Sequence, residues 1–258
     1  MPSPAAPKPA RKTAGRPTDS TITRELIVDV ALNQIDRVGI HAFSLRDVAR
    51  SLDVYPTTIY WHVASKEALL AEVSNLVMTG VVPPRGEGDW RTWMRKLFSR
   101  YRKSVRKHPN VAQLIGAQLA SNGALSIDLI EGVIDALLEA GATEANLREA
   151  YNSVISSMMG FMTMELAPLP TDDPEGWAKA LEGRVRSIDP LAHPTLTRYL
   201  PLLANRAFIL RWQNGTEIPL NSSFDAQVEI FLAGLEAFLG GKTPSGRSKV
   251  RPARRSES

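Results

Sequence analysis

Residues 43–70 read FSLRDVARSLDVYPTTIYWHVASKEALL. Apolar residues recur at helical spacing from Leu45 to Leu52, and Ser44 stands where an N-cap residue is favoured. After a turn at 53–55, Pro56 can occupy the first turn of a second short helix that covers 57–63. Two short helices joined by a tight turn predict a helix-turn-helix, whose second helix enters the major groove of DNA.

The flanking sequence adds further helices to this motif. Apolar side chains recur on one face from Thr21 to Val38, and Gly39 is placed to end that helix. Residues 66–78 predict another helix, and Ser44 with Asp47 resembles a capping box in which Asp replaces the usual Glu or Gln. We therefore expect a helical DNA-binding domain over 21–80.

The quoted stretch resembles the DNA-binding domain of the tetracycline-repressor (TetR) family. The resemblance rests on IYWHV at 59–63 and KEALL at 66–70, and it extends over 21–78. It implies a homodimeric, ligand-responsive transcriptional regulator, usually a repressor that a small molecule releases from an inverted-repeat operator in double-stranded DNA. The family commonly has Gly in the turn where this chain has Asp53. Asp tolerates the left-handed backbone better than most residues, so we expect the turn to be kept.

The expected DNA contacts lie on the two short helices and just after them. The start of the recognition helix brings residues 55–58 towards bases or phosphates. The resemblance implies that Arg46 reads a base. It also implies that Tyr60, His62 and Lys66 bind phosphates and fix the register. The expected set is Ser44, Arg46, Tyr55, Pro56, Thr57, Thr58, Tyr60, His62 and Lys66.

Two side chains of this motif, those of Arg46 and Trp61, have alternative interpretations. Arg46 can instead form a surface ion pair with Asp47 or Asp53, which is ordinary behaviour for exposed charges. The indole of Trp61 can touch DNA or cover the small core of the domain, and an aromatic residue at helical spacing favours the core.

The remaining sequence predicts a second helical domain. Pro and Gly residues break the pattern over 82–89, and a long amphipathic helix then runs from Trp90 to near Pro109. No long alternating strand pattern is found, so the fold class is all-α: a three-helix helix-turn-helix domain and a larger ligand-binding and dimerisation domain over 89–241. Further helices are expected at 111–121, 126–140, 144–165, 177–186, 196–212 and 224–239.

Composition narrows the class of protein. The chain has 258 residues, 43% of them apolar, and no cysteine, which excludes disulfides and thiolate chemistry. Basic residues outnumber acidic ones in 1–20 and 242–258, and we expect these segments to be flexible basic tails that add salt-sensitive attraction to phosphates or only solubility. No secretory or membrane-spanning apolar stretch is found, which favours a cytoplasmic protein with no membrane partner.

The second domain carries the expected effector and dimer contacts. The effector candidates are Trp93, Leu97, Tyr101, Gln113, Met158 and Met162. Methionines adapt to apolar ligands, but they also fill ordinary cores, and the ordinary core is the favoured interpretation. The resemblance implies that helices 144–165 and 224–239 of two protomers pack together, and an intramolecular core explains the same apolar stripe. The expected dimer residues are Phe224, Val228, Phe231, Leu235 and Phe238.

Signals of catalysis are weak in this sequence. The four histidines are scattered without metal-binding spacing, so we expect no metal, no cofactor and no catalytic residue. Residues 241–243 read GKT, but the first glycine of a phosphate-binding loop would fall at Glu236, inside a predicted helix. The alternative function is a small-molecule-binding or protein-interaction helical bundle without sequence-specific DNA binding.

Overall fold

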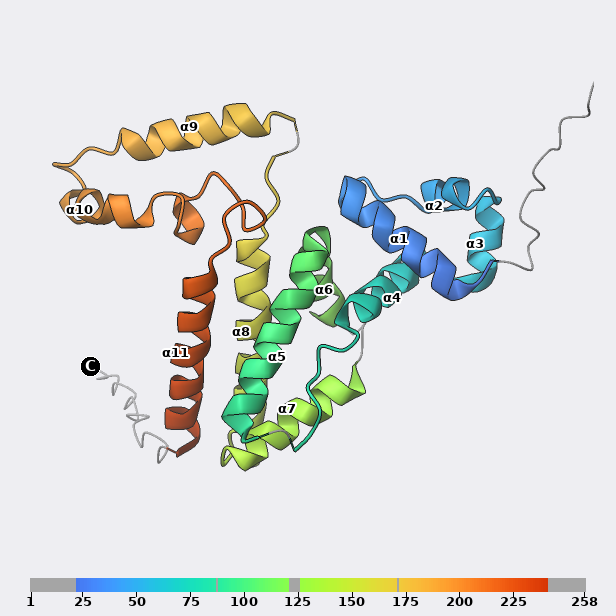
Figure 1. The fold of residues 1–258 in the computed structure, drawn as a ribbon, viewed down its shortest axis with the longest axis horizontal. Helices are drawn as coiled ribbons and strands as arrows, with labels where there is room; N and C mark the ends of the chain where they lie inside the picture. Colours follow the sequence, from blue (N-terminus) through green and yellow to red (C-terminus); the bar gives the residue numbers. More distant parts are fainter. Residues whose placement is uncertain (1–21, 87, 121–125, 171, 241–258) are drawn as a thin grey trace, which may run out of the picture. The chain divides into compact units, whose positions relative to one another are not determined.

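The computed structural model describes residues 22–86, 88–120, 126–170 and 172–240, and these form helices without any strand (Figure 1). The all-α prediction is confirmed. Both predicted basic tails lie outside the described residues. The α-helices are α1 Arg24–Val38, α2 Leu45–Ser51, α3 Pro56–His62, α4 Lys66–Met78, α5 Trp90–Lys107, α6 Ala112–Ala120, α7 Ile127–Glu139, α8 Leu147–Glu165, α9 Pro174–Arg186, α10 Pro194–Leu203 and α11 Asn221–Gly240. Two short 3-10 helices are η2 Pro109–Val111 and η3 Phe208–Leu210.

The described residues divide into two compact units. One contains α1–α4 together with η2 and α6, and the other contains α5 and α7–α11. The first unit is therefore not continuous in sequence, because α5 separates α4 from α6.

Side chains from α1–α4 form the core of the first unit. Ile27, Ile35, Val48, Ile59 and Leu69 have no exposed surface. These residues occupy the apolar face of each helix, and their burial removes most of their surface from water, which is the main force that holds such a small domain together.

The end of α1 holds η2 in the first unit. The amide of Asn110 donates to the carbonyl oxygens of Ile35 and Asp36, at 3.1 and 3.0 Å. His108 Nδ1 lies 2.7 Å from a carboxylate oxygen of Asp36. The last carbonyls of a helix lack intrahelical partners, and Asn110 supplies a donor to two of them. Together with the His108–Asp36 contact, this ties the start of α6 to the DNA-binding helices.

Within the second unit, α5 packs against α7, α8 and α11, and α8 packs against α7 and α11. Two ion pairs join the outer faces of α5 and α11: Arg95 binds both carboxylate oxygens of Glu229, at 2.6 and 2.8 Å, and Arg91 binds Glu236. The strongly basic α5 is thereby matched by acidic side chains of α11.

The predicted helix over 196–212 is wrong in its second half. Helix α10 ends at Leu203, and Asn205 follows with φ of 56° in the left-handed region. The side-chain oxygen of Asn205 accepts hydrogen bonds from the backbone N–H groups of Trp212 and Gln213, at 3.2 and 3.1 Å. The Asn205 side chain thus stabilises a loop instead of a helix, because Asn side chains compete with helical hydrogen bonds for nearby backbone groups.

Glycine allows the same loop to reach the end of α8. The backbone N–H of Gly215 donates to the carbonyl of Glu165 at 2.7 Å, and a Cβ at Gly215 would clash with the Glu165 side chain and carbonyl. Only glycine fits this approach.

Candidate nucleic-acid interface

The turn between α2 and α3 has the geometry that the sequence predicts. The hydroxyl oxygen of Ser44 caps α2 by accepting from the N–H of Arg46 at 3.2 Å. Asp53 has φ of 52°, which confirms the left-handed turn residue, and the N–H of Val54 returns to the carbonyl of Ala49 at 3.0 Å. Tyr55 then stands at the N-cap position of α3 without a side-chain capping hydrogen bond, and Pro56 occupies the first turn. The capping box is only half formed, because Asp47 pairs with Arg50 of the same helix.

Helix α3 presents one polar and aromatic face to solvent. Tyr55 is 66% exposed and Tyr60 is 55% exposed, and Pro56 and Thr57 are also exposed. Thr58 and His62 are partly buried. Ile59 points inward and anchors the helix to the domain core. The expected contact residues at 55–58 and Tyr60 are therefore accessible to a large partner.

Trp61 contradicts the interpretation favoured by the sequence. Its side chain is 88% exposed, so it does not cover the core of the domain. Ile59 and Val63, on either side of it in the sequence, fill the core instead. An indole exposed to this extent on the same helix as Tyr60 instead favours the alternative interpretation of Trp61, contact with DNA.

The ion pair on α2 does not involve Arg46, whose side chain is exposed to a partner. The structure pairs Asp47 with Arg50, and the Arg46 side chain is exposed. A guanidinium that projects from the start of α2 can form two hydrogen bonds with one guanine or with a phosphate.

Lys66 is held in place by the residue that opens the motif. Its ammonium donates to the carbonyl of Phe43 at 3.0 Å and lies 5.3 Å from the centre of the Phe43 ring. These contacts fix the position of the charge and leave further N–H donors on the ammonium, which suits a phosphate contact.

Two carboxylates near the interface remain ionised at neutral pH. Backbone N–H groups in the first turns of α1 and α4 lower the pKa of Glu25 and of Glu67, and the hydroxyls of Thr23 and Ser65 act in the same direction. Negative charge at these two helix starts opposes phosphate binding there.

The effector candidates fall in both units. Trp93, Leu97 and Tyr101 of α5 and Met158 and Met162 of α8 are all buried in the second unit. Gln113 lies on α6, in the first unit. The phenol oxygen of Tyr101 is buried without a hydrogen-bond partner among the described residues, and burial raises the pKa of this phenol.

The dimer candidates on α11 point in different directions. Phe224, Val228 and Leu235 are buried within the chain, and Phe231 packs against Phe98 with ring centres 5.5 Å apart. Phe238 is 50% exposed. The outward face of α11 also carries Ile230, which is 73% exposed and was not among the sequence candidates.

No helix among the described residues is both long and apolar enough to cross a membrane.

Comparisons with known proteins cover nearly the whole described chain. Residues 27–73 match the model for bacterial regulatory proteins of the tetR family, and residues 82–239 match the tetracyclin repressor-like, C-terminal domain. A helix-turn-helix-type transcriptional regulator of Saccharopolyspora erythraea is 27% identical over 225 residues, which are 86% of this chain and 88% of that protein. The class D tetracycline repressor protein of Escherichia coli is 27% identical over 97 residues, which are 36% of this chain and 44% of that repressor.

Solved structures share the fold. Apo ActR from Streptomyces coelicolor superposes with a TM-score of 0.65 at 21% identity, over 85% of this chain and 97% of ActR. BioQ, crystallised with its natural double-stranded DNA operator, has a TM-score of 0.54 at 28% identity, over 57% of this chain and 88% of BioQ.

Proposed function

The chain belongs to the tetR family of bacterial regulatory proteins and is a DNA-binding transcriptional regulator, and we propose that it acts as a homodimeric repressor released from its operator by a small molecule. The observation that carries this proposal is the helix-turn-helix at 45–62, in which α3 exposes its aromatic and hydroxyl side chains around a buried Ile59. The expected site of action is the cytoplasm, where a bacterial operator lies.

The proposed DNA contacts divide into two roles. Arg46 and residues 55–58 read base edges in the major groove, whereas Tyr60, His62 and Lys66 bind phosphates. Ser44 caps α2, and its hydroxyl is a further candidate for a phosphate contact. Trp61 joins the phosphate-contacting group, because its exposed indole can pack against the sugar-phosphate backbone and donate one N–H.

The proposed dimer uses the outward faces of α8 and α11. On α11, Ile230 and Phe238 are exposed, and on α8 the exposed Ser156, Gly160 and Met164 follow one face. Small and apolar side chains on both helices allow close packing of two copies about a twofold axis. Two recognition helices are then available for two half-sites of an inverted repeat.

Most of the proposed effector contacts lie on α5 and α8. Trp93, Leu97 and Tyr101 with Met158 and Met162 supply apolar surface, and the unpartnered Tyr101 hydroxyl supplies one polar group. Gln113 of α6 is a further candidate, on a helix that is tied to α1 through η2. A ligand that binds better when the recognition helices are wrongly spaced shifts the protein off DNA.

We propose no catalytic role. The relatives named above are regulators, and the chemistry of the proposed site is recognition. A helical bundle that lacks sequence-specific DNA binding is not favoured, because it does not account for the helix-turn-helix geometry and exposed side chains of residues 44–66.

The direct test is the binding of purified protein to fragments of its own genome at physiological salt, followed by sequencing of the retained DNA. We expect enrichment of one inverted repeat. Retention that is blind to sequence and lost with salt would contradict the proposal.

Two substitutions then test the division of roles on that operator. Arg46→Ala should reduce the discrimination between bases at one operator position by about 1 to 3 kcal/mol. Lys66→Ala should lower the affinity for all DNA sequences similarly and reduce the slope of log affinity against log salt concentration by about one. Arg37→Ala, which removes an exposed charge from α1, is the control and should change neither. An equal loss of selectivity from Arg46→Ala and Lys66→Ala would reject the division.

A further inference from the structure

A cavity of about 240 Å³ lies in the second unit where α8 ends, between α9, η3 and the loop after η3. Its lining combines apolar side chains with the polar residues Glu165, Gln213 and Asn214. The apolar ones include Pro168, Leu169, Trp177, Leu181 and Phe208. Arg211 also lines this cavity. This cavity shares no residue with the proposed effector contacts on α5 and α8.

Arg211 is an unusual residue to find there, because it is only 8% exposed. Its Nε donates to the carbonyl of Gln213 at 3.1 Å, and Nη2 donates to the carbonyl of Ile218 at 2.9 Å. No carboxylate of the described residues lies within hydrogen-bonding distance of this guanidinium. A guanidinium has five N–H donors, so most of its donor capacity is unused by these two carbonyls.

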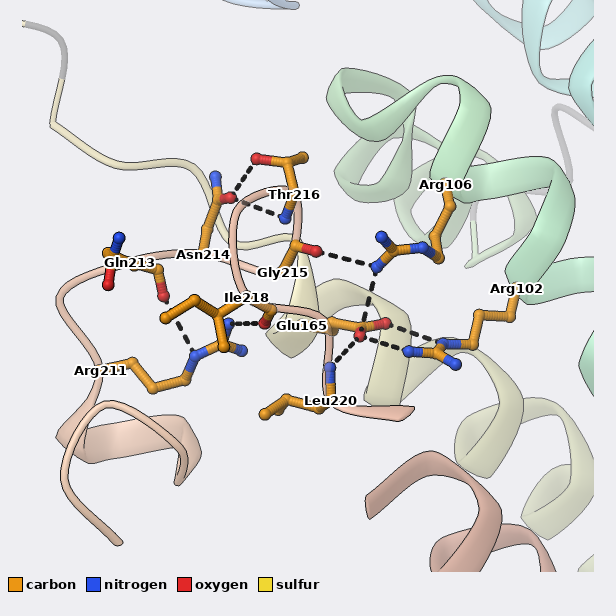
Figure 2. Close-up of polar contacts among 10 residues, drawn as sticks. All are labelled: Arg102, Arg106, Glu165, Arg211, Gln213, Asn214, Gly215, Thr216, Ile218 and Leu220. Atoms are coloured by element: carbon orange, nitrogen blue, oxygen red, sulfur yellow. Dashed lines mark hydrogen bonds and ion pairs between the residues drawn. The ribbon is translucent and has the colours of Figure 1, made fainter. Parts of the chain in front are cut away.

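The nearest buried carboxylate is already saturated. Glu165 is fully buried at the end of α8, and Figure 2 shows its carboxylate turned toward Arg102 and Arg106. Arg102 binds both oxygens, at 2.6 and 3.1 Å. The N–H of Leu220 adds a hydrogen bond at 2.8 Å, and Arg106 approaches to 3.4 Å.

The local charge is therefore unbalanced. Arg102 and Arg106 both bind the Glu165 carboxylate, whereas the guanidinium of Arg211 lies apart from it, beside Gln213 and Ile218 (Figure 2). Burial lowers the pKa of Arg211, while the field of Glu165 acts in the opposite direction. A largely buried guanidinium without a directly paired carboxylate loses hydration that Glu165 offsets only from a distance, and an anion that enters the cavity would pair with it directly.

We propose that this cavity binds a small amphipathic carboxylate, whose charged end pairs with Arg211 and whose hydrocarbon body packs against Trp177, Leu181 and Phe208. A planar carboxylate matches the fork of a guanidinium, and the apolar side chains of the lining favour an anion that carries a hydrocarbon body. The alternative role of Arg211 is purely structural, in which it only ties the loop carbonyls of Gln213 and Ile218 together. This site goes beyond the proposed function, because its occupation requires neither an operator nor the α5–α8 contacts.

The experiment is calorimetric titration of the full chain, without DNA, with octanoate, octan-1-ol and octyltrimethylammonium. These probes share the hydrocarbon body and differ in charge. We expect one octanoate per chain, bound at least tenfold more tightly than the alcohol, and no binding of the cation. Equal binding of octanoate and octan-1-ol, or no binding of octanoate, would overturn the proposal.

Substitutions locate the bound anion. Arg211→Gln should weaken octanoate binding by about 10- to 100-fold, to the level of the alcohol. Arg206→Gln removes an equal charge from an exposed position before η3 and should leave binding unchanged. If folded Arg211→Gln binds octanoate as the parent does, the anion lies elsewhere and the proposal fails.

A second pair of variants covers the case in which Arg211→Gln does not fold. Ala167 lines the cavity from an exposed position, so substitutions there do not disturb the core. Ala167→Glu places a negative charge at the rim and should weaken octanoate binding about fivefold relative to the neutral Ala167→Gln. Equal affinities of these two variants would reject an anion site at Arg211.

Discussion

At the scale of single residues, Ile59 and Trp61 show how α3 separates folding from recognition. Two residues along a helix turn the side chain through roughly 200°, so these neighbours face opposite ways. Ile59 has no exposed surface, and Trp61 is 88% exposed. The first therefore contributes to the free energy of unfolding, and the second is free to contribute to binding.

Substitution of these two residues should affect different measurements. Trp61→Ala should leave the melting temperature unchanged and weaken operator binding roughly tenfold, because an exposed indole stabilises only a complex. Ile59→Ala should cost about 2 to 5 kcal/mol of stability by creating a cavity. Calorimetry and fluorescence-anisotropy titrations of the same samples would separate the effects. A drop in melting temperature for Trp61→Ala as large as that for Ile59→Ala would show that the indole belongs to the core.

At the scale of helices, the contact between α5 and α7 depends on one glycine. A Cβ on Gly132 of α7 would lie 2.6 Å from Cζ2 of Trp93, nearer than carbon atoms can approach. The indole cannot easily move aside, since its N–H donates to the carbonyl of Pro83 at 3.1 Å. The spacing of the two helices is thus set by a glycine that faces a fixed ring.

Gly132→Ala should therefore destabilise the protein by about 1 to 3 kcal/mol, the usual cost of overpacking a core. Gly183→Ala is the matched control: Gly183 lies inside α9, and no atom would meet its Cβ. It should stabilise by up to about 1 kcal/mol, because alanine is the better helix former. Thermal unfolding of both variants provides the comparison, and a neutral Gly132→Ala would mean that α5 and α7 are packed loosely.

The start of α5 gives a prediction about pH. Asp89 accepts from the N–H of Thr92 at 2.8 Å, and this hydrogen bond, with that of the Thr92 hydroxyl, lowers the pKa of Asp89 from its usual 3.8. A lowered pKa in the folded state means that the carboxylate stabilises the fold above its unfolded pKa, and that this contribution disappears as pH falls through the folded pKa. The Asp89→Ala variant should melt below the parent at neutral pH, and the difference should narrow as the pH falls below 3.8. A difference that stays constant over that range would exclude a charge-dependent cap.

Helix positions and the DNA-binding motif were largely predictable, since local signals determine them. The prediction of helix 66–78 is confirmed to the residue, and the turn at Asp53 follows from its place between two short helices. The exposure of Trp61 was not predictable, because burial depends on which distant helices pack around a residue. The cavity at Arg211 also eluded prediction, since Gly215 and Glu165 meet only in the folded chain.

At the scale of the whole molecule, the dimer face proposed on α8 and α11 predicts a coupling between dimer formation and DNA binding. Figure 1 shows the two helices side by side in the second unit, and the exposed Ile230 and Phe238 lie on α11. A single recognition helix reads too few bases for useful specificity, whereas a twofold dimer reads two half-sites about 34 to 36 Å apart. A substitution that prevents dimer formation should therefore also weaken operator binding.

Ile230→Glu tests this coupling. A carboxylate at a position that becomes buried between two copies would lose its hydration without gaining a partner, which costs several kcal/mol per chain in a symmetric interface. Sedimentation velocity should then show a monomer, and affinity for the complete inverted repeat should fall to that for a single half-site. Leu202→Glu is the control, since Leu202 on α10 is 70% exposed, close to the 73% of Ile230, and lies outside α8 and α11. A dimer that survives Ile230→Glu but dissociates with Leu202→Glu would place the interface on α10, and both half-sites would then be read through a different arrangement of the same recognition helices.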